Sequence, residues 1–324
     1  MGILPHQAPS WEVSEWLQLP RGKASLDIND VNFTAKVLYL YCSRKKEREA
    51  MPELPEVETI RRGLETRLVG QTITGVRVRQ ARLRHVVDVA VLQQQAVGCT
   101  IEGIERRAKY LLFRLHPDRV LVFHLGMTGR LGVGPPASED APHDHLIFRL
   151  GAELELRFHD TRRFGMCFLT MATDLLQHPR FRSLGPEPLS EGFSPTHLQT
   201  RARGSRRPVK NFLMDATVVV GIGNIYASEC LFLARVRPTR QVGRLRQPHW
   251  ERIYTAVQQV LQAAIDNRGT TLKDYVDSEG RQGGFQNQLL VYGREGEPCT
   301  RGHRRIRRIV QAGRSSYYCP GCQR

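Results

Sequence analysis

The sequence contains no long apolar run. No stretch of its 324 residues approaches the ~18 consecutive apolar residues that a membrane-spanning helix requires. The N-terminus also lacks the basic-then-apolar order of a secretory signal. We therefore expect a cytoplasmic protein with no membrane partner.

Acidic residues are also in deficit. The chain has 32 acidic against 48 basic residues, which gives a formal net charge of +16. The excess is clustered: residues 201–210 hold five bases and no acid, and residues 291–324 hold eight arginines and two glutamates. Such basic stripes are typical of a protein that binds a polyanion, with nucleic acid as the leading partner. A solvated or membrane-surface patch is the alternative.

Cysteines are few and odd in number. Seven cysteines without an export signal favour a reducing compartment. Four are isolated and are expected to be ordinary buried thiols: Cys42, Cys99, Cys167 and Cys230. Only Cys299, Cys319 and Cys322 form a group.

The order of periodic segments predicts an α+β protein with two domains and small appendages. A helix over residues 55–68 precedes alternating segments at 72–79, 101–104, 110–115, 120–124, 145–150 and 154–158, which together suggest a β-sandwich or barrel. Residues 174–200 are rich in Pro, Gly and Ser and read as a linker. Helical spacing then returns at 198–203, 208–216 and 250–265.

Residues 1–50 lack clear periodicity and do not resemble the rest of the chain. They could be a regulatory or targeting extension. A mis-assigned start codon is the preferred interpretation, because Lys46-Glu47 can be encoded as a bacterial ribosome-binding sequence three codons before Met51. The native protein would then begin at Met51 or Pro52.

The segment MPELPEVE at residues 51–58 is the most informative stretch. Its prolines and acids are ordinary features of a helix N-terminus. If Met51 were removed, however, Pro52 would carry a free secondary amine. An α-amino group titrates near pH ~8, so part of it is neutral and nucleophilic at physiological pH. Its attack on a carbonyl-like carbon would give an iminium, and Glu53 and Glu56 could move protons for that step.

This octapeptide resembles the start of the formamidopyrimidine-DNA glycosylase / endonuclease VIII family. Leu54 and the run Glu56-Val57-Glu58 are more similar to the formamidopyrimidine branch. The resemblance continues in order through residues 51–324. It implies an N-terminal catalytic β-sandwich with a leading helix over 51–175, a linker and helix–two-turn–helix DNA-binding domain over 176–290, and a zinc finger over 291–324.

Three loops of the β-rich half carry unusual polar content. They hold Lys109, then His124 with Met127, and then Arg162 with Phe164. A surface lysine, a core methionine and an aromatic loop anchor are the ordinary interpretations. Together they suit an enzyme that extrudes a base, because apolar side chains must fill the vacated stack while cations hold the backbone. The resemblance assigns Lys109 to strand cleavage and the other four residues, with His143, to DNA contact.

The segment VGIGNIYASE at residues 220–229 places two glycines and Asn224 before a helix-forming run. Bare backbone amides at a helix start bind phosphate, although a glycine turn alone is weak evidence. The resemblance makes this the helix–two-turn–helix, with Asn224 at a phosphate-contacting position and with Arg206 and Lys210 just upstream. Residues 277–288, rich in Gly and Gln, resemble a flexible loop that closes over the extruded base.

The C-terminal cysteines have the spacing of a structural zinc site, which takes four Cys or His ligands in two close pairs. Cys319 and Cys322 form a C-x-x-C pair, whereas the family's second cysteine falls at Gly302. His303 lies one position later. Three outcomes stay open: His303 completes a Cys3His site with Cys299, water or another residue completes a weaker site, or the hairpin folds without metal. The resemblance places Arg314 at the hairpin tip in the last elimination step; otherwise it is one more arginine in a basic tail.

The resemblance implies a bifunctional DNA glycosylase/AP lyase that binds damaged double-stranded DNA and excises oxidised purines, acting as a monomer. Its catalytic residues would be Pro52, Glu53, Glu56, Lys109 and Arg314. A non-catalytic DNA-binding protein is the alternative if the extension is retained, because Pro52 would then be an amide. An endonuclease VIII-like preference for oxidised pyrimidines is disfavoured by Leu54 and by residues 281–285.

Overall fold

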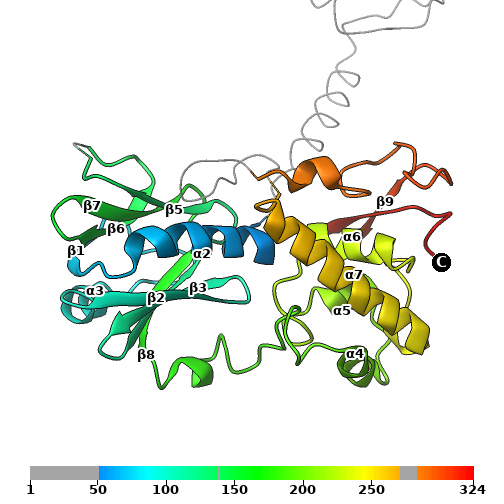
Figure 1. Cartoon of the computed structure of the whole chain (residues 1–324), viewed down its shortest axis with the longest axis horizontal. Helices are drawn as coiled ribbons and strands as arrows, with labels where there is room; N and C mark the ends of the chain where they lie inside the picture. Colours follow the sequence, from blue (N-terminus) through cyan, green and yellow to red (C-terminus); the bar gives the residue numbers. More distant parts are fainter. Residues whose placement is uncertain (1–50, 138, 271–282) are drawn as a thin grey trace, which may run out of the picture. The chain divides into compact units, whose positions relative to one another are not determined.

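The computed structural model describes residues 51–137, 139–270 and 283–324. Within these ranges the first half of the chain forms two antiparallel sheets and the second half is helical, ending in a two-stranded hairpin (Figure 1). Residues 1–50 and the first part of the predicted 277–288 loop lie outside the described residues; Phe285–Gln288 forms a short 3-10 helix, η4. No helix in the described ranges is long and apolar enough to span a membrane.

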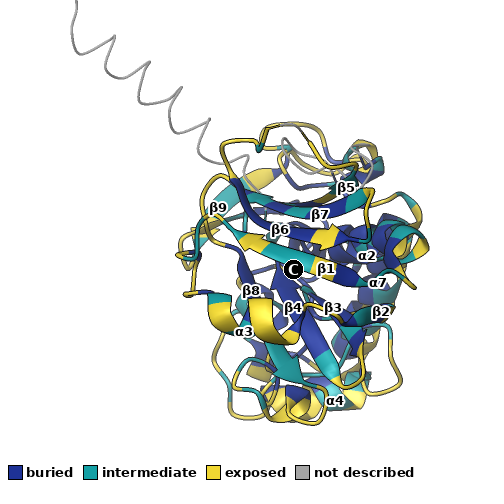
Figure 2. Ribbon diagram, turned by 90° about the vertical axis from the view of Figure 1, so that its left-hand side faces the viewer, coloured by how far each residue is buried: buried dark blue, intermediate teal, exposed yellow. Residues whose placement is uncertain are grey.

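The two sheets have four strands each and confirm the predicted β-sandwich. One has the order β1-β6-β7-β5 and the other β2-β3-β4-β8. Their strands are β1 (Ile73–Val78), β2 (Thr100–Arg107), β3 (Tyr110–His116), β4 (Arg119–His124), β5 (Gly129–Gly134), β6 (Asp144–Leu150), β7 (Leu154–Asp160) and β8 (Met166–Met171). Buried aliphatic and phenylalanine side chains of both sheets form one core. In Figure 2 long stretches of the strands carry the dark blue of buried residues.

Helix α2 (Leu54–Leu68) is the predicted leading helix. Val57, Ile60, Leu64 and Leu68 recur at helical spacing and join the sandwich core. The helix starts at Leu54 because proline is tolerated in the first turn and because the Glu56 carboxylate accepts the backbone N–H of Glu53, 2.8 Å away. The N-terminal end of α2 therefore carries two glutamates toward the helical half of the chain (Figure 1).

The helical half has its own core. Its elements are α4 (Pro195–Ala202), α5 (Val209–Leu213), α6 (Asn224–Leu233), η3 (Val242–Arg244) and α7 (Gln247–Asp266). The short helix η2 (Leu175–Gln177) precedes them, and its Leu175 packs against residues of β3 and β4. Helix α6 is buried along most of its length, and α7 packs against it. The core continues into the hairpin of β9 (Arg307–Gln311) and β10 (Arg314–Tyr318) through Tyr317 and the three C-terminal cysteines.

Three elements were not predicted from the sequence. Strand β5 contains three glycines, which weaken its β signal, and β8 is a short apolar run without alternation. Helix α3 (Val89–Gln95) buries only Leu92, so it has almost no apolar periodicity. The Asp88 carboxylate caps this helix by accepting the backbone N–H of Val91 at 3.0 Å.

Candidate active site

A cavity of about 520 Å³ lies where the N-terminus of α2, the β2–β3 turn, the start of α6 and the β9–β10 turn meet. Met51 lines it, and the buried Pro52 follows directly. The cavity brings together several residues that the sequence predicted for chemistry and DNA contact. Its polar and sulfur-containing lining side chains are Met51, Glu53, Lys109, Tyr110, His124, Met127, Met214, Asn224, Tyr292 and Arg314.

Glu53 is buried at the wall of this cavity and caps helix α6. Its carboxylate accepts the backbone N–H groups of Gly223 at 2.6 Å, Ile225 at 2.9 Å and Tyr226 at 3.4 Å. A Cβ at Gly223 would lie 2.3 Å from the carboxyl carbon of Glu53, so only glycine permits this approach. Burial raises the pKa of Glu53, against the opposing effects of the Lys109 charge and the three amides.

This geometry changes one interpretation of the glycine-rich turn. The bare amides at residues 220–229 were predicted to bind a phosphate. In the structure these helix-start amides bind the Glu53 carboxylate, so the anion at the N-terminus of α6 belongs to the chain itself. The turn therefore fixes a carboxylate in the cavity instead of offering these amides to an outside ligand. The side chain of Asn224 still lines the cavity.

Glu56 lies one helical turn behind Glu53 and is also buried. Its Oε1 accepts the hydroxyl of Tyr226 at 2.5 Å and the backbone N–H of Thr270 at 2.7 Å. Burial, and next the repulsion of Glu53, raise the pKa of Glu56 to about 7. Since Oε2 holds the backbone N–H of Glu53, this carboxyl group fixes the start of α2 against α6.

Lys109 follows the turn between β2 and β3. Ala108 adopts φ 55° there, and the Glu187 carboxylate accepts its backbone N–H at 2.7 Å. Glu187 also pairs with Arg106 and Arg107, so the end of β2 and the start of the turn are tied to the linker. Burial lowers the pKa of Lys109, and the charges of Glu53 and Glu56 oppose that effect. An ammonium with a lowered pKa is able to lose its proton more readily and act as a base.

His124 and Met127 line the cavity opposite the start of α6. Nδ1 of His124 accepts the backbone N–H of Gly126 at 3.0 Å, which leaves Nε2 as the ring's donor. Burial, and then the charges of Lys109, Arg84 and Arg180, lower the pKa of His124 to about 3. The ring is therefore neutral and offers a hydrogen bond without adding charge.

Two loops stand side by side, and one of them reaches the cavity through Met127. We call residues 125–129 and 160–165 the insertion loops. The buried Asp160 carboxylate accepts the Thr128 hydroxyl at 2.5 Å and the backbone N–H of Gly165 at 2.7 Å, which ties the two loops together. Phe164 stays 42% exposed, with the Arg162 guanidinium 4.8 Å from its ring centroid. Arg162 and Phe164 therefore lie on the outside of a loop that the Asp160 hydrogen bonds hold in place.

The remaining predicted DNA-contacting residues lie in different surroundings. His143 is exposed, and its ring centroid is 5.7 Å from that of His159. Arg206 is exposed and does not line the cavity. Lys210 is buried: its Nζ donates to the Asn224 side chain at 2.6 Å and to Ser315 and Ser316 of β10. Burial lowers its pKa to about 7.

Arg314 and Lys210 together join the hairpin to the cavity. Arg314 begins β10, is exposed, and lines the cavity together with Gly313. Because Lys210 holds the backbone carbonyl of Ser315 at 2.8 Å, the residue next to Arg314 is anchored to α5. The contacts of Lys210 with β10 thus hold the hairpin turn at the cavity.

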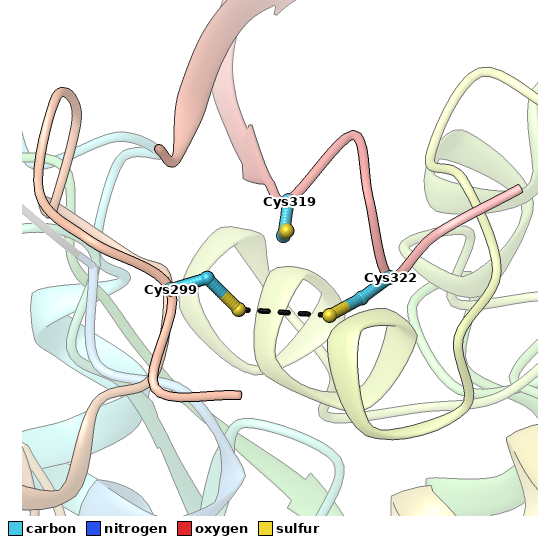
Figure 3. A group of neighbouring side chains, drawn as sticks. All are labelled: Cys299, Cys319 and Cys322. Carbon is cyan, nitrogen blue, oxygen red and sulfur yellow. Dashed lines mark hydrogen bonds between the residues drawn. The ribbon is translucent and has the colours of Figure 1, made fainter. Parts of the chain in front are cut away.

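The C-terminal cysteines gather into a cluster. The sulfur atoms of Cys299, Cys319 and Cys322 lie within 4.8 Å of one another and point toward a common centre (Figure 3). Sγ of Cys299 and Sγ of Cys322 are 3.5 Å apart. Three converging thiols in a hairpin are compatible with a metal site.

The sequence did not identify several residues on which this site depends. Tyr226 and Thr270 hold Glu56, Asp160 joins the insertion loops, and Tyr292 contacts Asn224 at 3.3 Å. Tyr226 stands inside the glycine-rich motif, and that position was the one signal available for it. The other three carry no local pattern, because their partners are distant in sequence.

Comparison with known proteins agrees with this geometry. Residues 51–167 match the model of the formamidopyrimidine-DNA glycosylase N-terminal domain, and residues 184–276 match the model of its H2TH domain. Formamidopyrimidine-DNA glycosylases of Hahella chejuensis and Thiobacillus denitrificans are 45% and 48% identical over 274 residues, which is 85% of this chain and 100% of each relative.

Solved structures give the same result. A Lactococcus lactis Fpg (MutM) complex with Fapy-dG-containing DNA has a TM-score of 0.78 at 35% identity, covering 84% of this chain and 100% of that chain. A complex of the same organism's Fpg with abasic-site DNA has the same TM-score and identity, covering 84% and 99%. The chain belongs to the formamidopyrimidine-DNA glycosylase family.

Proposed function

We propose that this protein is a bifunctional DNA glycosylase/AP lyase of base excision repair, which excises formamidopyrimidines and 8-oxoguanine from damaged duplex DNA. The observation that carries the proposal is the cavity at residues 51–53. Glu53 lies in its wall with Lys109 and Arg314, directly after the proline that would supply the amine. The relatives are named formamidopyrimidine-DNA glycosylases, and the Lactococcus protein binds Fapy-dG-containing and abasic-site DNA.

The reaction begins at the nitrogen of Pro52. In the 324-residue sequence this nitrogen is an amide bonded to Met51, and Met51 lines the cavity. We propose that the active protein begins at Pro52, where the family match also starts to within one residue. Loss of Met51 both frees the amine and opens the space in which a deoxyribose would stand.

The free amine then attacks C1′ of the damaged nucleotide, and the glycosidic bond breaks as the base leaves with its electron pair and takes up the proton that the amine loses. Glu53, protonated more readily because burial raises its pKa, gives a proton to the ring oxygen as the sugar opens. The nitrogen and C1′ now share an iminium double bond. Lys109 accepts a proton from C2′ for β-elimination of the 3′ phosphate, and Arg314 supports δ-elimination of the 5′ phosphate.

Glu56 positions this chemistry and does not take part in it. Its carboxyl group is engaged by Tyr226, Thr270 and the N–H of Glu53. The DNA contacts follow from exposure and location. Arg162 and Phe164 enter the helix with Met127, and His143 and Arg206 lie against phosphates outside the cavity. The remaining polar contacts come from His124 and Asn224 in the cavity lining and from Lys210, which lines a smaller neighbouring pocket with Asn224 and Arg314.

The cysteine cluster fits one structural zinc ion. Tetrahedral zinc with Zn–S distances of ~2.3 Å needs sulfur atoms ~3.8 Å apart, close to the observed cluster. Nδ1 of His303 is 3.2 Å from Sγ of Cys322, so a histidine nitrogen lies beside the three-cysteine cluster without being part of it. We propose a Cys3His site of Cys299, His303, Cys319 and Cys322, which holds the hairpin that carries Arg314. Zinc content of the His303→Ala variant, measured by mass spectrometry of the native protein, should fall, while Arg304→Ala, its neighbour, should keep one ion.

The test of the function uses borohydride, which reduces an iminium to a stable amine. Protein that begins at Pro52 should become covalently trapped on duplex DNA containing 8-oxoguanine, whereas protein that retains residues 1–51 should not. Pro52→Gly should abolish trapping at the secondary amine. Trapping that is undiminished with the extension in place would overturn the assignment of Pro52. Binding to damaged DNA without trapping in either form would instead favour a non-catalytic DNA-binding protein.

A further inference from the structure

A second basic segment lies in the helical half and is not used by the proposed chemistry. Residues 235–246 hold five arginines and no acid. This segment connects α6 to α7, so it is distant in sequence from the first basic run at residues 201–210. The two segments together hold ten bases and no acidic side chain. We define the basic ridge as Arg203, Arg206, Arg240, Arg244 and Arg246.

Backbone hydrogen bonds hold the two segments side by side. The N–H of Val209 donates to the carbonyl of Arg240 at 2.8 Å, the N–H of Val242 to Arg207 at 3.0 Å, and the N–H of Gly243 to Ser205 at 3.1 Å. A Cβ at Gly243 would lie 2.8 Å from the Ser205 carbonyl oxygen, so the close approach requires glycine. The positive charge of the ridge is therefore concentrated by the fold and not by sequence alone.

Much of this charge is not neutralised within the chain. Arg203, Arg206 and Arg244 are exposed, and among the described residues their side chains make no hydrogen bond or ion pair. Arg207 differs, because it pairs with Asp215 at 2.6 Å. The field of the ridge also reaches His249: burial, and then the charges of Arg240, Arg252 and Arg246, lower the pKa of this histidine. Unneutralised surface charge of one sign is what a polyanion surface provides.

The connection between α6 and α7, which carries three of the ridge arginines, contacts the C-terminal hairpin. The carbonyl of Pro238 accepts the N–H of Lys210 at 3.3 Å and the side-chain amide of Gln311 at 3.2 Å. Gln311 and Arg314 pair across the β9–β10 turn, and Arg314 lines the cavity. The α6–α7 connection that carries Arg240, Arg244 and Arg246 therefore contacts the hairpin whose turn lines the cavity.

We propose that the basic ridge binds the phosphate backbone of duplex DNA on one side of the lesion, beyond the nucleotides that the cavity and insertion loops contact. The inference rests on the proposed function, since it takes the cavity as the position of the lesion. The ligand is duplex DNA and not a free anion, because the arginines are spread along two chain segments instead of converging on one point. Phosphates lie one per ~1.7 Å of duplex axis and suit such a spread.

The experiment varies the length of the duplex on each side of a central tetrahydrofuran abasic analogue. Protein that begins at Pro52 is titrated with a short duplex of about 12 base pairs and with duplexes extended by about 10 base pairs, or ~34 Å, on the 5′ or the 3′ side. Dissociation constants are measured over a range of salt concentrations. We expect only one of the two extensions to tighten binding and to steepen the dependence of affinity on salt.

The test variant is Arg203→Gln/Arg244→Gln, and Arg62→Gln/Arg149→Gln is its control. Both lower the net charge by two, but Arg62 and Arg149 are exposed on the sandwich half. Each phosphate contact contributes ~0.9 to the slope of log affinity against log salt, so the test variant should lose ~2 on the favoured duplex and nothing on the short one. Arg203→Lys/Arg244→Lys should keep most of the slope.

The proposal would be overturned if the test and control variants lost the same slope of log affinity against log salt on the extended duplex. It would also be overturned if neither extension tightened binding. These results differ from failure of the proposed function, which would appear as an absence of borohydride trapping on every duplex. A benefit from extension that the test variant retains would place the additional contacts elsewhere on the surface.

Discussion

The junction between α2 and α6 is buried, whereas the insertion loops are exposed. Both regions depend on a buried carboxylate, but only the carboxylate at the junction faces the cavity. In both, one buried carboxylate accepts several N–H or O–H groups and fixes a chain segment. At the junction Glu53 holds the start of α6 and itself faces the cavity. In the insertion loops Asp160 stays fully buried behind the backbone, and the side chains that project are Arg162 and Phe164.

In the function we propose, this difference separates chemistry from recognition. A group that transfers a proton must be desolvated and held to within tenths of an ångström, so the junction buries it between two halves of the chain. A side chain that enters a base stack must reach outward, and burial is needed only for its support. Changes at the junction should therefore lower the rate of the chemical step, and changes in the insertion loops should weaken DNA binding.

The largest effect is expected for Glu53→Gln. The variant keeps the size of the side chain but loses the proton donor, and its amide NH2 would face the N–H groups of α6. General acid–base catalysis contributes ~10²- to 10⁴-fold, so kcat should fall by about that factor with much smaller change in KM. Glu65→Gln, on the same helix and with its side chain 45% exposed, should keep the parent's kcat. A variant that loses affinity instead of rate would contradict the separation.

The sequence alone identified one side of the junction and not the other. The proline–glutamate start and the leading helix were visible because they are local in the chain. The partners of Glu53 are not: Gly223 stands 170 residues away, and the turn that holds it carried a pattern equally suited to binding a phosphate. Which anion occupies a helix start depends on tertiary contact, and the chain pattern does not contain that information.

The insertion loops show the same limit. Met127, Arg162 and Phe164 were identified from residue type and order, but Asp160 was not singled out among them. Its role depends on the pairing of β7 with β5, which brings Gly129 opposite it, and β5 itself was missed because of its glycines. The exposed residues of the site were thus easier to predict than the buried groups that place them.

The next effect concerns the pH dependence of stability. The pKa of Glu56 is raised from 4.5 to about 7 in the fold, so between these values the folded protein binds more protons than the unfolded chain. Stability should fall as pH rises through this window and then level off above about 7. The contribution is roughly 3 kcal/mol. Urea unfolding should show this loss in the parent and not in Glu56→Gln.

The control for this measurement is again Glu65→Gln, which removes a half-exposed carboxylate from the same helix. Glu56→Gln will also be less stable at every pH, because its NH2 meets the backbone N–H of Glu53. The diagnostic quantity is therefore the change with pH in the difference between the two proteins' free energies of unfolding. A constant difference across the window would show that Glu56 ionises normally in the fold.

A smaller effect is expected for Phe164→Ala. Stacking of an aromatic side chain on a base contributes about 1–3 kcal/mol, so the dissociation constant for abasic-analogue DNA should rise by roughly 5- to 150-fold. Once DNA is bound at saturation, kcat should change little, because the junction is intact. Leu176→Ala, which removes an exposed side chain outside the insertion loops, is the control. A loss of kcat as large as that of Glu53→Gln would show that Phe164 is also needed for the chemical step.

The smallest effect tests the tie between the insertion loops. The Thr128 hydroxyl donates to Asp160 at 2.5 Å and accepts the backbone N–H of Arg162 at 3.1 Å, and valine has the same shape without either bond. Thr128→Val should cost about 1 kcal/mol, or roughly fivefold in affinity, with Thr173→Val as the exposed control. Because the tie acts only through the placement of Phe164, the Thr128→Val/Phe164→Ala double variant should bind no more weakly than Phe164→Ala alone. Additive losses would mean that Thr128 contacts DNA directly.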